Sequence, residues 1–145
     1  MAITDTQVAA LRAQLAGDAE EHRRLLGNLD QHADGSSYAT LLACAFSEAV
    51  ERRFGLTPDR AAVVEFVGDL RARAETIRQR LSAEVAERTI MTVYGEGSVN
   101  DLDDETVTYA QVVTTTGLIS DEQLSDAELD SFMAEVRSVA ERLVS

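Results

Sequence analysis

The amino-acid sequence predicts an all-α protein, a single-domain bundle of five to seven helices with mostly antiparallel neighbours. Apolar residues recur at helical spacing along most of the 145 residues. The chain contains only one proline, and its eight glycines lie mostly between the periodic segments. Helices with one apolar face must pack against one another, so we expect one core over residues 1–145.

The first apolar stripe, residues 8–29, predicts one long helix with Thr4 or Thr6 as its N-cap. Gly17 interrupts the stripe, and Asp18 with Glu21 has the spacing of a second capping pair, which would give two shorter helices. The stripe keeps its phase across Gly17, so we prefer one long helix with a bend there.

The next two helices have clear sequence boundaries. Ser37 is a good N-cap for the second helix, and Gly55 fits the position just after its end. Thr57 followed by Pro58 predicts the start of a third helix, because proline at the first helical position gives up an N–H that would have no partner. The apolar face of this third helix extends to Leu81.

Ser82 predicts the start of a fourth helix, which the glycines from Gly95 onward end. Residues 104–116 are ambiguous. Their threonines and valines favour a strand that would pair with residues 89–94 as a hairpin. Their apolar positions fit a helical face better, so we expect a helix that ends at Gly117.

The C-terminal segment is an unambiguous helix in the sequence. Ser125 and Glu128 form a capping box ahead of a regular apolar stripe that extends to Leu143. Ser120 and Gln123 have the same spacing and predict a short capped turn before it.

The chain is strongly acidic, with a net charge of −13. All thirteen basic residues are arginine, which is typical of a GC-rich, bacterial genome. Residues 1–95 are nearly neutral, with eleven arginines against fourteen acids, whereas residues 96–145 have two against twelve. Such a charge makes nucleic-acid binding unlikely and disfavours anionic membranes. It suits solubility, or docking onto a basic protein partner.

The sequence indicates no membrane span and no cofactor. The longest apolar run, LLACAF, is far too short to cross a bilayer. The N-terminal segment has no basic region followed by an apolar core, so a cytoplasmic location is expected. The single cysteine, Cys44, excludes an internal disulfide and any cysteine-rich metal site, and a small core residue is its expected role.

Four acids gather in the segment SVNDLDDETVTY and resemble a cation-binding loop. They are Asp101, Asp103, Asp104 and Glu105. An EF-hand loop that begins at Asp101 needs glycine at its sixth position and glutamate at its twelfth, where this chain has Thr106 and Val112. A helix start explains the acids more simply, because the helix dipole favours negative charge in the first turn. We expect no metal site here, with Ser98, Asn100 or Asp101 as the cap.

His22 lies on the inner stripe of the first helix and is a candidate pocket residue. Asp18 precedes it by one helical turn and could pair with it. The other histidine, His32, is ten residues away, which does not place the two rings as a metal clamp. A partly buried structural role is the expected one for His22.

A group of four arginines occupies the predicted third helix. Its members are Arg71, Arg73, Arg78 and Arg80. Their spacing of seven predicts two rows on the exposed side of one helix. Such rows are either a solvated face or a dock for an acidic surface, and the acidic C-terminal third offers one within the domain or in a homodimer.

The sequence contains no phosphate loop, nucleophile elbow or Cys-x-x-Cys pair, so no catalytic residue is assigned. We therefore favour a non-enzymatic, acidic helical interaction or adaptor protein that binds a basic partner and could be a homodimer. The alternative is a small-molecule-binding protein or enzyme with an interhelical pocket that contains His22. A DNA-binding regulator ranks third because the overall charge has the wrong sign.

Overall fold

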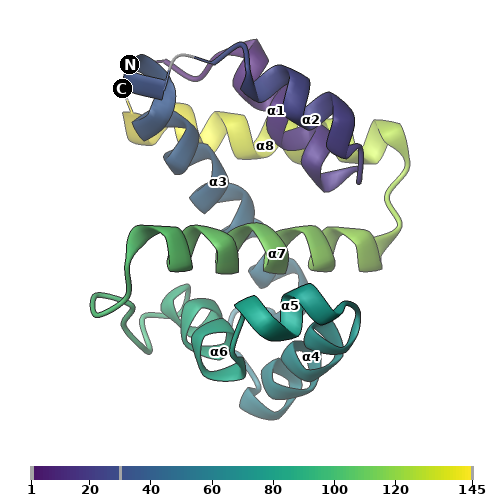
Figure 1. Cartoon of the computed structure of the whole chain (residues 1–145), viewed down its shortest axis with the longest axis vertical. Helices are drawn as coiled ribbons and strands as arrows, with labels where there is room; N and C mark the ends of the chain where they lie inside the picture. The colour runs from purple at the N-terminus through teal and green to yellow at the C-terminus, as the bar shows by residue number, and fades with distance from the viewer. Residues whose placement is uncertain (1, 30, 145) are drawn as a thin grey trace. The chain divides into compact units, whose positions relative to one another are not determined.

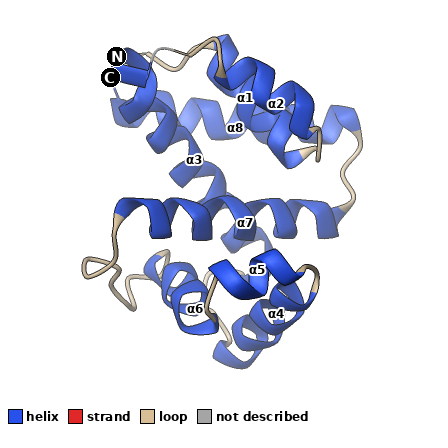
Figure 2. Cartoon of the chain, viewed as in Figure 1, coloured by secondary structure: helices blue, strands red, loops and turns tan. Residues whose placement is uncertain are grey.

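The computed structural model describes residues 2–29 and 31–144, for residues 31–34 the backbone only. Over these residues the chain consists of helices joined by loops, without a strand (Figure 2). The helices are α1 (Asp5–Leu15), α2 (Ala19–Leu26), α3 (Gln31–Phe54), α4 (Arg60–Ala72), α5 (Glu75–Arg80), α6 (Ala83–Thr92), α7 (Asp104–Glu122) and α8 (Asp126–Val144). The all-α prediction is confirmed, and the hairpin alternative is excluded. The expected count of five to seven helices is wrong, because the described part contains eight.

The helices gather into two compact units, which is a finer division than the one bundle that we expected. Unit 1 contains Met1–Glu48 and Ile119–Ser145, and unit 2 contains Ala49–Leu118. Helices α3 and α7 therefore contribute residues to both units (Figure 1). The change from near-neutral to acidic sequence at residues 95 and 96 falls inside unit 2.

Each unit has its own set of buried apolar side chains. In unit 1, the largest fully buried ones are Leu11, Leu41, Phe46, Phe132 and Met133. In unit 2, they are Val50, Val63, Leu70, Leu81, Ile90 and Leu118. None of the helices in the described ranges is long and apolar enough to cross a membrane.

The long first helix that we expected is two helices, α1 and α2. Gly17 has φ +81°, a left-handed conformation that an L side chain adopts only with strain. The carboxylate of Asp18 then accepts a hydrogen bond from the backbone N–H of Glu21 and caps α2. At the other end of α1, Thr4 and Gln7 form a reciprocal capping box.

Helix α3 begins at Gln31, well before the start that the sequence suggested. Ser37 lies inside this helix and is buried, so it is not an N-cap. Its hydroxyl accepts a hydrogen bond of 2.8 Å from the side-chain amide of Gln7. Because Gln7 is fully buried, this bond gives the NH2 group of its amide an acceptor away from water.

The expected third helix is also two helices, and it starts later than predicted. Asp59, and not Thr57, caps α4 by accepting a hydrogen bond from the N–H of Ala61. The chain leaves the helix at Arg73 and becomes extended at Ala74, before α5 begins. Nothing in the local sequence marks this break with a glycine or a proline.

Helix α7 continues past Gly117 to Glu122, so the predicted end at Gly117 and the short capped turn at Ser120 are both wrong. A Cβ atom at Gly117 would lie 2.7 Å from Cδ1 of Leu70, so the missing side chain permits close packing of α7 on α4. The predicted starts of α6 at Ser82 and of α8 at Ser125 are confirmed by cap hydrogen bonds.

Candidate functional site

Among the residues that the structure describes, several arginines hold separate segments of the fold together. Five of them donate hydrogen bonds to main-chain carbonyls in other segments of their own unit, and these are Arg12, Arg71, Arg73, Arg88 and Arg137. Arginine suits this role because its planar guanidinium carries five donors in a fixed geometry. We call these five residues the fastening arginines.

In unit 1, two fastening arginines hold α1 and α8 together at two points. Arg12 Nε lies 2.6 Å from Oδ1 of Asp130, and Arg137 Nη1 lies 2.6 Å from Oδ1 of Asp5. Arg137 also donates to the carbonyl of Ile3 at 3.0 Å. The start of α1 therefore lies against the second half of α8, and its end against the first half, so the two helices are antiparallel.

In unit 2, Arg71 joins α4 to the end of α5, and Arg73 joins the end of α4 to α7. Arg71 Nε donates to the carbonyl of Leu81 at 2.8 Å. Arg73 donates to the carbonyl of Gly117 at 3.4 Å and pairs with Asp69 at 2.7 Å. Both side chains thus bind elements of their own unit, which leaves them poorly placed to dock a separate acidic surface.

Arg78 and Arg80 belong to α5, whereas Arg71 lies in α4. The prediction of two rows along one exposed helix is therefore wrong, because the chain breaks at Ala74. The guanidinium of Arg80 lies 4.0 Å from the ring centroid of Tyr109 on α7, within the range of a cation–π interaction.

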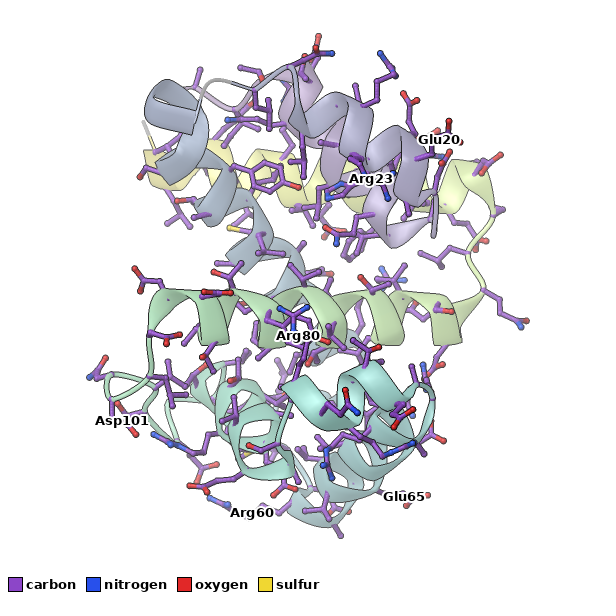
Figure 3. All side chains as sticks on the ribbon, viewed as in Figure 1. Glu20, Arg23, Arg60, Glu65, Arg80 and Asp101 are labelled. Atoms are coloured by element: carbon purple, nitrogen blue, oxygen red, sulfur yellow. The ribbon has the colours of Figure 1, made fainter. Side chains whose placement is uncertain are left out.

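Arg88 of α6 fastens the loop that leads to α7. Its Nη2 lies 2.5 Å from Oδ1 of Asp101 and 2.5 Å from the carbonyl oxygen of Ser98. The hydrogen bond from Arg88 lowers the pKa of the Asp101 carboxyl. Figure 3 places Asp101 on this loop, at the edge of unit 2. Asp101 is thus a partner of Arg88, and neither it, Ser98 nor Asn100 is the cap of α7.

The other acids of the predicted cluster form the start of α7. Asp103 accepts a hydrogen bond of 2.7 Å from the backbone N–H of Thr106 and so caps the helix. Hydrogen bonds from Thr106 lower the pKa of Asp103. Asp104 and Glu105 occupy the first helical turn, as expected. Within the described ranges, no three His, Cys, Asp or Glu side chains lie close enough together to hold a metal ion.

Two of the predicted groups meet at a shallow depression beside the start of α7. Arg80 from the arginine group lines it together with Asp103, Glu105, Thr106 and Tyr109, around a volume of about 190 Å³. Opposite charges share this small space, so we interpret it as part of the packing between α5 and α7.

A larger groove lies elsewhere in unit 2, between α6, the start of α4 and the loop after α6. Its volume is about 600 Å³. Met91 and Ala83 supply apolar surface. Five charged residues also line it, and these are Arg60, Glu84, Glu87, Arg88 and Glu96. Five of its eight lining residues are therefore charged, whereas the pockets that bind small molecules usually contain few charged groups.

The electrostatic balance of this groove is negative. The charge of Arg88 is offset by Asp101, with which it is hydrogen bonded. Arg60 and Glu96 approach only to 4.0 Å, and both are well exposed. Counting Asp101, two arginines stand against four carboxylates, which leaves a net charge of −2. The groove thus favours a cation.

His22 does not form the predicted pair with Asp18. Its Nδ1 lies 2.6 Å from the carbonyl oxygen of Ala10, which requires a proton on Nδ1. The Asp18 carboxylate instead caps α2. The half-buried imidazole therefore ties α2 to α1, in agreement with a structural role. The side chain of His32 lies outside the described residues.

Sequence reasoning missed the groove. Glu84, Glu87, Arg88 and Met91 follow a spacing of three and four residues, so one shared face of a helix was predictable. Arg60 is distant in the sequence, and no local pattern links it to α6.

The exposed charge of the protein is mostly carboxylate. Asp126 is 98% exposed and Asp5 is 94% exposed, although each contacts an arginine. Unit 1 has five arginines against fourteen acids, a net charge of −9, and unit 2 has eight against twelve, a net charge of −4. Both units therefore present a negative surface.

No protein-family model matches the sequence, and the chain is not significantly similar to any curated protein or solved structure with which it was compared.

Proposed function

We propose that this protein is a non-enzymatic, acidic interaction protein that binds a basic protein partner. The observation that carries the proposal is the placement of the fastening arginines. These side chains bind carbonyls and carboxylates of their own unit, so five of the thirteen positive charges are used within the fold. The carboxylates, which outnumber the arginines by two to one, dominate the surface.

A negative surface of this kind attracts a basic partner electrostatically before the two proteins touch. A net charge of −13 on 145 residues produces a negative potential that raises the rate of encounter with basic proteins. The same potential repels nucleic acids, because their phosphates are also negative. The proposal therefore predicts a binding affinity that falls steeply as salt concentration rises.

The test begins with capture of partners from a lysate of the source organism at 50 mM and 500 mM salt. The captured protein is then purified, and its affinity for the full chain is measured by titration calorimetry. We expect a basic partner, and a complex that weakens at least tenfold at the higher salt. A lack of any salt-sensitive complex between purified components would contradict the proposal.

Matched variants on α2 make the test specific to charge. Glu20 and Arg23 both lie on the exposed surface of this helix (Figure 3). Glu20→Gln should weaken the complex, whereas Arg23→Gln should strengthen it, because the two changes move the net charge in opposite directions. Effects of equal sign would exclude an electrostatic mechanism.

The alternative function is binding of a small molecule in an interhelical pocket. The groove in unit 2 is the feature that favours it, but the residues that line this groove are mostly charged. A thermal-shift screen with metabolites separates the two functions, since one ligand with a large shift would favour the pocket. A homodimer and a cytoplasmic location remain predictions.

A further inference from the structure

We infer that the groove in unit 2 receives an arginine side chain of the basic partner. This inference rests on the proposed function and assigns a place for the contact. The groove is the larger of the two hollows described above, with a volume of about 600 Å³. Its lining combines an apolar floor with carboxylates, which is the combination that a long basic side chain needs.

The floor of the groove suits the aliphatic part of an arginine. Met91 is 4% exposed and Ala83 is half-buried, and both line the groove from α6. The three methylene groups of an arginine would cover this apolar surface while the guanidinium stays near the charged rim. A thioether side chain such as Met91 also adapts its shape to an incoming group.

Among the carboxylates of the groove, Glu87 is the strongest evidence for a cationic occupant. It is half-buried in the groove, between Glu84 and Arg88 along one side of α6. Arg88 is engaged by Asp101 and Ser98, and its approach to Glu84 is 3.8 Å. Among the residues that the structure describes, Glu87 has no ion-pair partner. A partly desolvated carboxylate without a partner gains most from a cation that enters beside it.

The arrangement of the carboxylates favours arginine over lysine. Glu84 and Glu87 lie one turn apart on α6, whereas Glu96 comes from the loop after α6. A guanidinium presents donors in several directions and can bond to two of these carboxylates at once, whereas an ammonium is a compact point charge. The contact of 4.0 Å between Arg60 and Glu96 is loose, so Glu96 is free to turn toward the occupant.

The inference is tested with a fluorescein-labelled hexa-arginine amide and the full chain, by fluorescence anisotropy at 50 mM salt. The groove variant is Glu87→Gln. The control variant is Glu135→Gln, an exposed position on α8 in the other unit with the same change of charge. We expect Glu87→Gln to weaken binding about tenfold and Glu135→Gln to weaken it less than twofold.

Each other outcome is decisive. Equal losses in the two variants would exclude the groove but leave the proposed function intact, because the peptide would then bind the acidic surface in general. If the wild-type chain does not bind hexa-arginine but still binds its basic partner, the assignment of the groove is wrong and the proposed function stands. Failure of both the peptide and the partner to bind would overturn the proposed function with it.

Two further measurements guard the interpretation. Circular dichroism and thermal melting should show that Glu87→Gln folds like the wild type, since glutamine retains most of the helix propensity of glutamate. A hexa-lysine amide should bind at least threefold more weakly than hexa-arginine. Equal affinities for the two peptides would contradict the assignment to arginine.

Discussion

Arg12 Nε and Asp130 Oδ1 lie 2.6 Å apart and join α1 to α8. Seven residues from each of them, Asp5 and Arg137 form a second pair with the charges exchanged between the helices. Seven residues are about two helical turns, so both pairs fall on the same side of each helix. A shift of α1 along α8 by one turn would break both pairs at once. The two contacts therefore fix the register of these antiparallel helices.

We predict that Arg12 and Asp130 are energetically coupled. In a double-mutant cycle with Arg12→Gln and Asp130→Asn, urea unfolding should give a coupling free energy of about 0.5–1 kcal/mol at 50 mM salt. The coupling should shrink at 500 mM salt, because both side chains are partly exposed. The cycle of Arg12→Gln with Glu135→Gln serves as the control and should be additive. Coupling of equal size in both cycles would contradict this prediction.

Gly117 and Gly68 should respond oppositely to alanine. Gly117→Ala places a Cβ 2.7 Å from Cδ1 of Leu70, which is only 1% exposed and has little room to move. We expect a loss of about 1–2 kcal/mol in unfolding free energy by urea denaturation. Gly68 lies in α4, and no atom lies within 4 Å of the place that a Cβ would take, so Gly68→Ala should gain about 0.5–1 kcal/mol. A stabilising effect of Gly117→Ala would show that the helices separate easily.

His22→Ala should reduce stability and leave partner binding unchanged. The bond from its Nδ1–H to the carbonyl of Ala10 is part-buried, and its loss should cost about 1 kcal/mol in a urea unfolding experiment. Nitrogen-15 spectra of the imidazole should show the Nδ1-protonated tautomer in the neutral form. The Nε2-protonated tautomer would contradict the contact with Ala10.

Asp101 should make the protein sensitive to acid. Its pKa is lowered by Arg88, so its contribution to stability is complete above the unfolded pKa, near pH 4. That contribution is lost as the pH falls through the lower pKa of the folded state. Urea midpoints between pH 2.5 and 7 should therefore fall less steeply for Asp101→Asn than for the wild type. Glu65→Gln, an exposed change in α4, is the control. Identical slopes in wild type and Asp101→Asn would refute this assignment.

Much of the fold could be predicted from local signals. The caps at Ser82 and at Ser125 with Glu128 appeared where their side chains satisfy the free N–H groups of a helix start. The choice of helix over strand for residues 104–116 was also correct, because their apolar positions follow the helical period.

The failures have physical causes outside the local sequence. The phase of the apolar stripe favoured one helix across Gly17. The chain instead forms two helices, because the backbone at Gly17 is left-handed and Asp18 caps a new helix. The break at Ala74 has no local signal and coincides with hydrogen bonds from Arg71 and Arg73 to distant carbonyls. Tertiary contacts of this kind override the propensity to continue a helix.

The candidate site was even less predictable. The charged face of α6 could be read from its spacing, but the groove also needs Arg60 and Glu96 from two other segments. The acidic run at residues 101–105 attracted attention because it is dense, whereas the structure uses Asp101 and Asp103 for a fastener and a cap.

The fastening arginines also imply an asymmetric tolerance of acid and alkali. A guanidinium remains protonated up to about pH 12, and a main-chain carbonyl does not titrate at all. Lysines in the same places would begin to lose their protons near pH 10, and their charge-assisted hydrogen bonds would weaken as a result. Because this chain has no lysine, its tertiary contacts should persist to higher pH than those of most proteins. Acid should break only the pairs with carboxylates and leave the bonds to main-chain carbonyls intact.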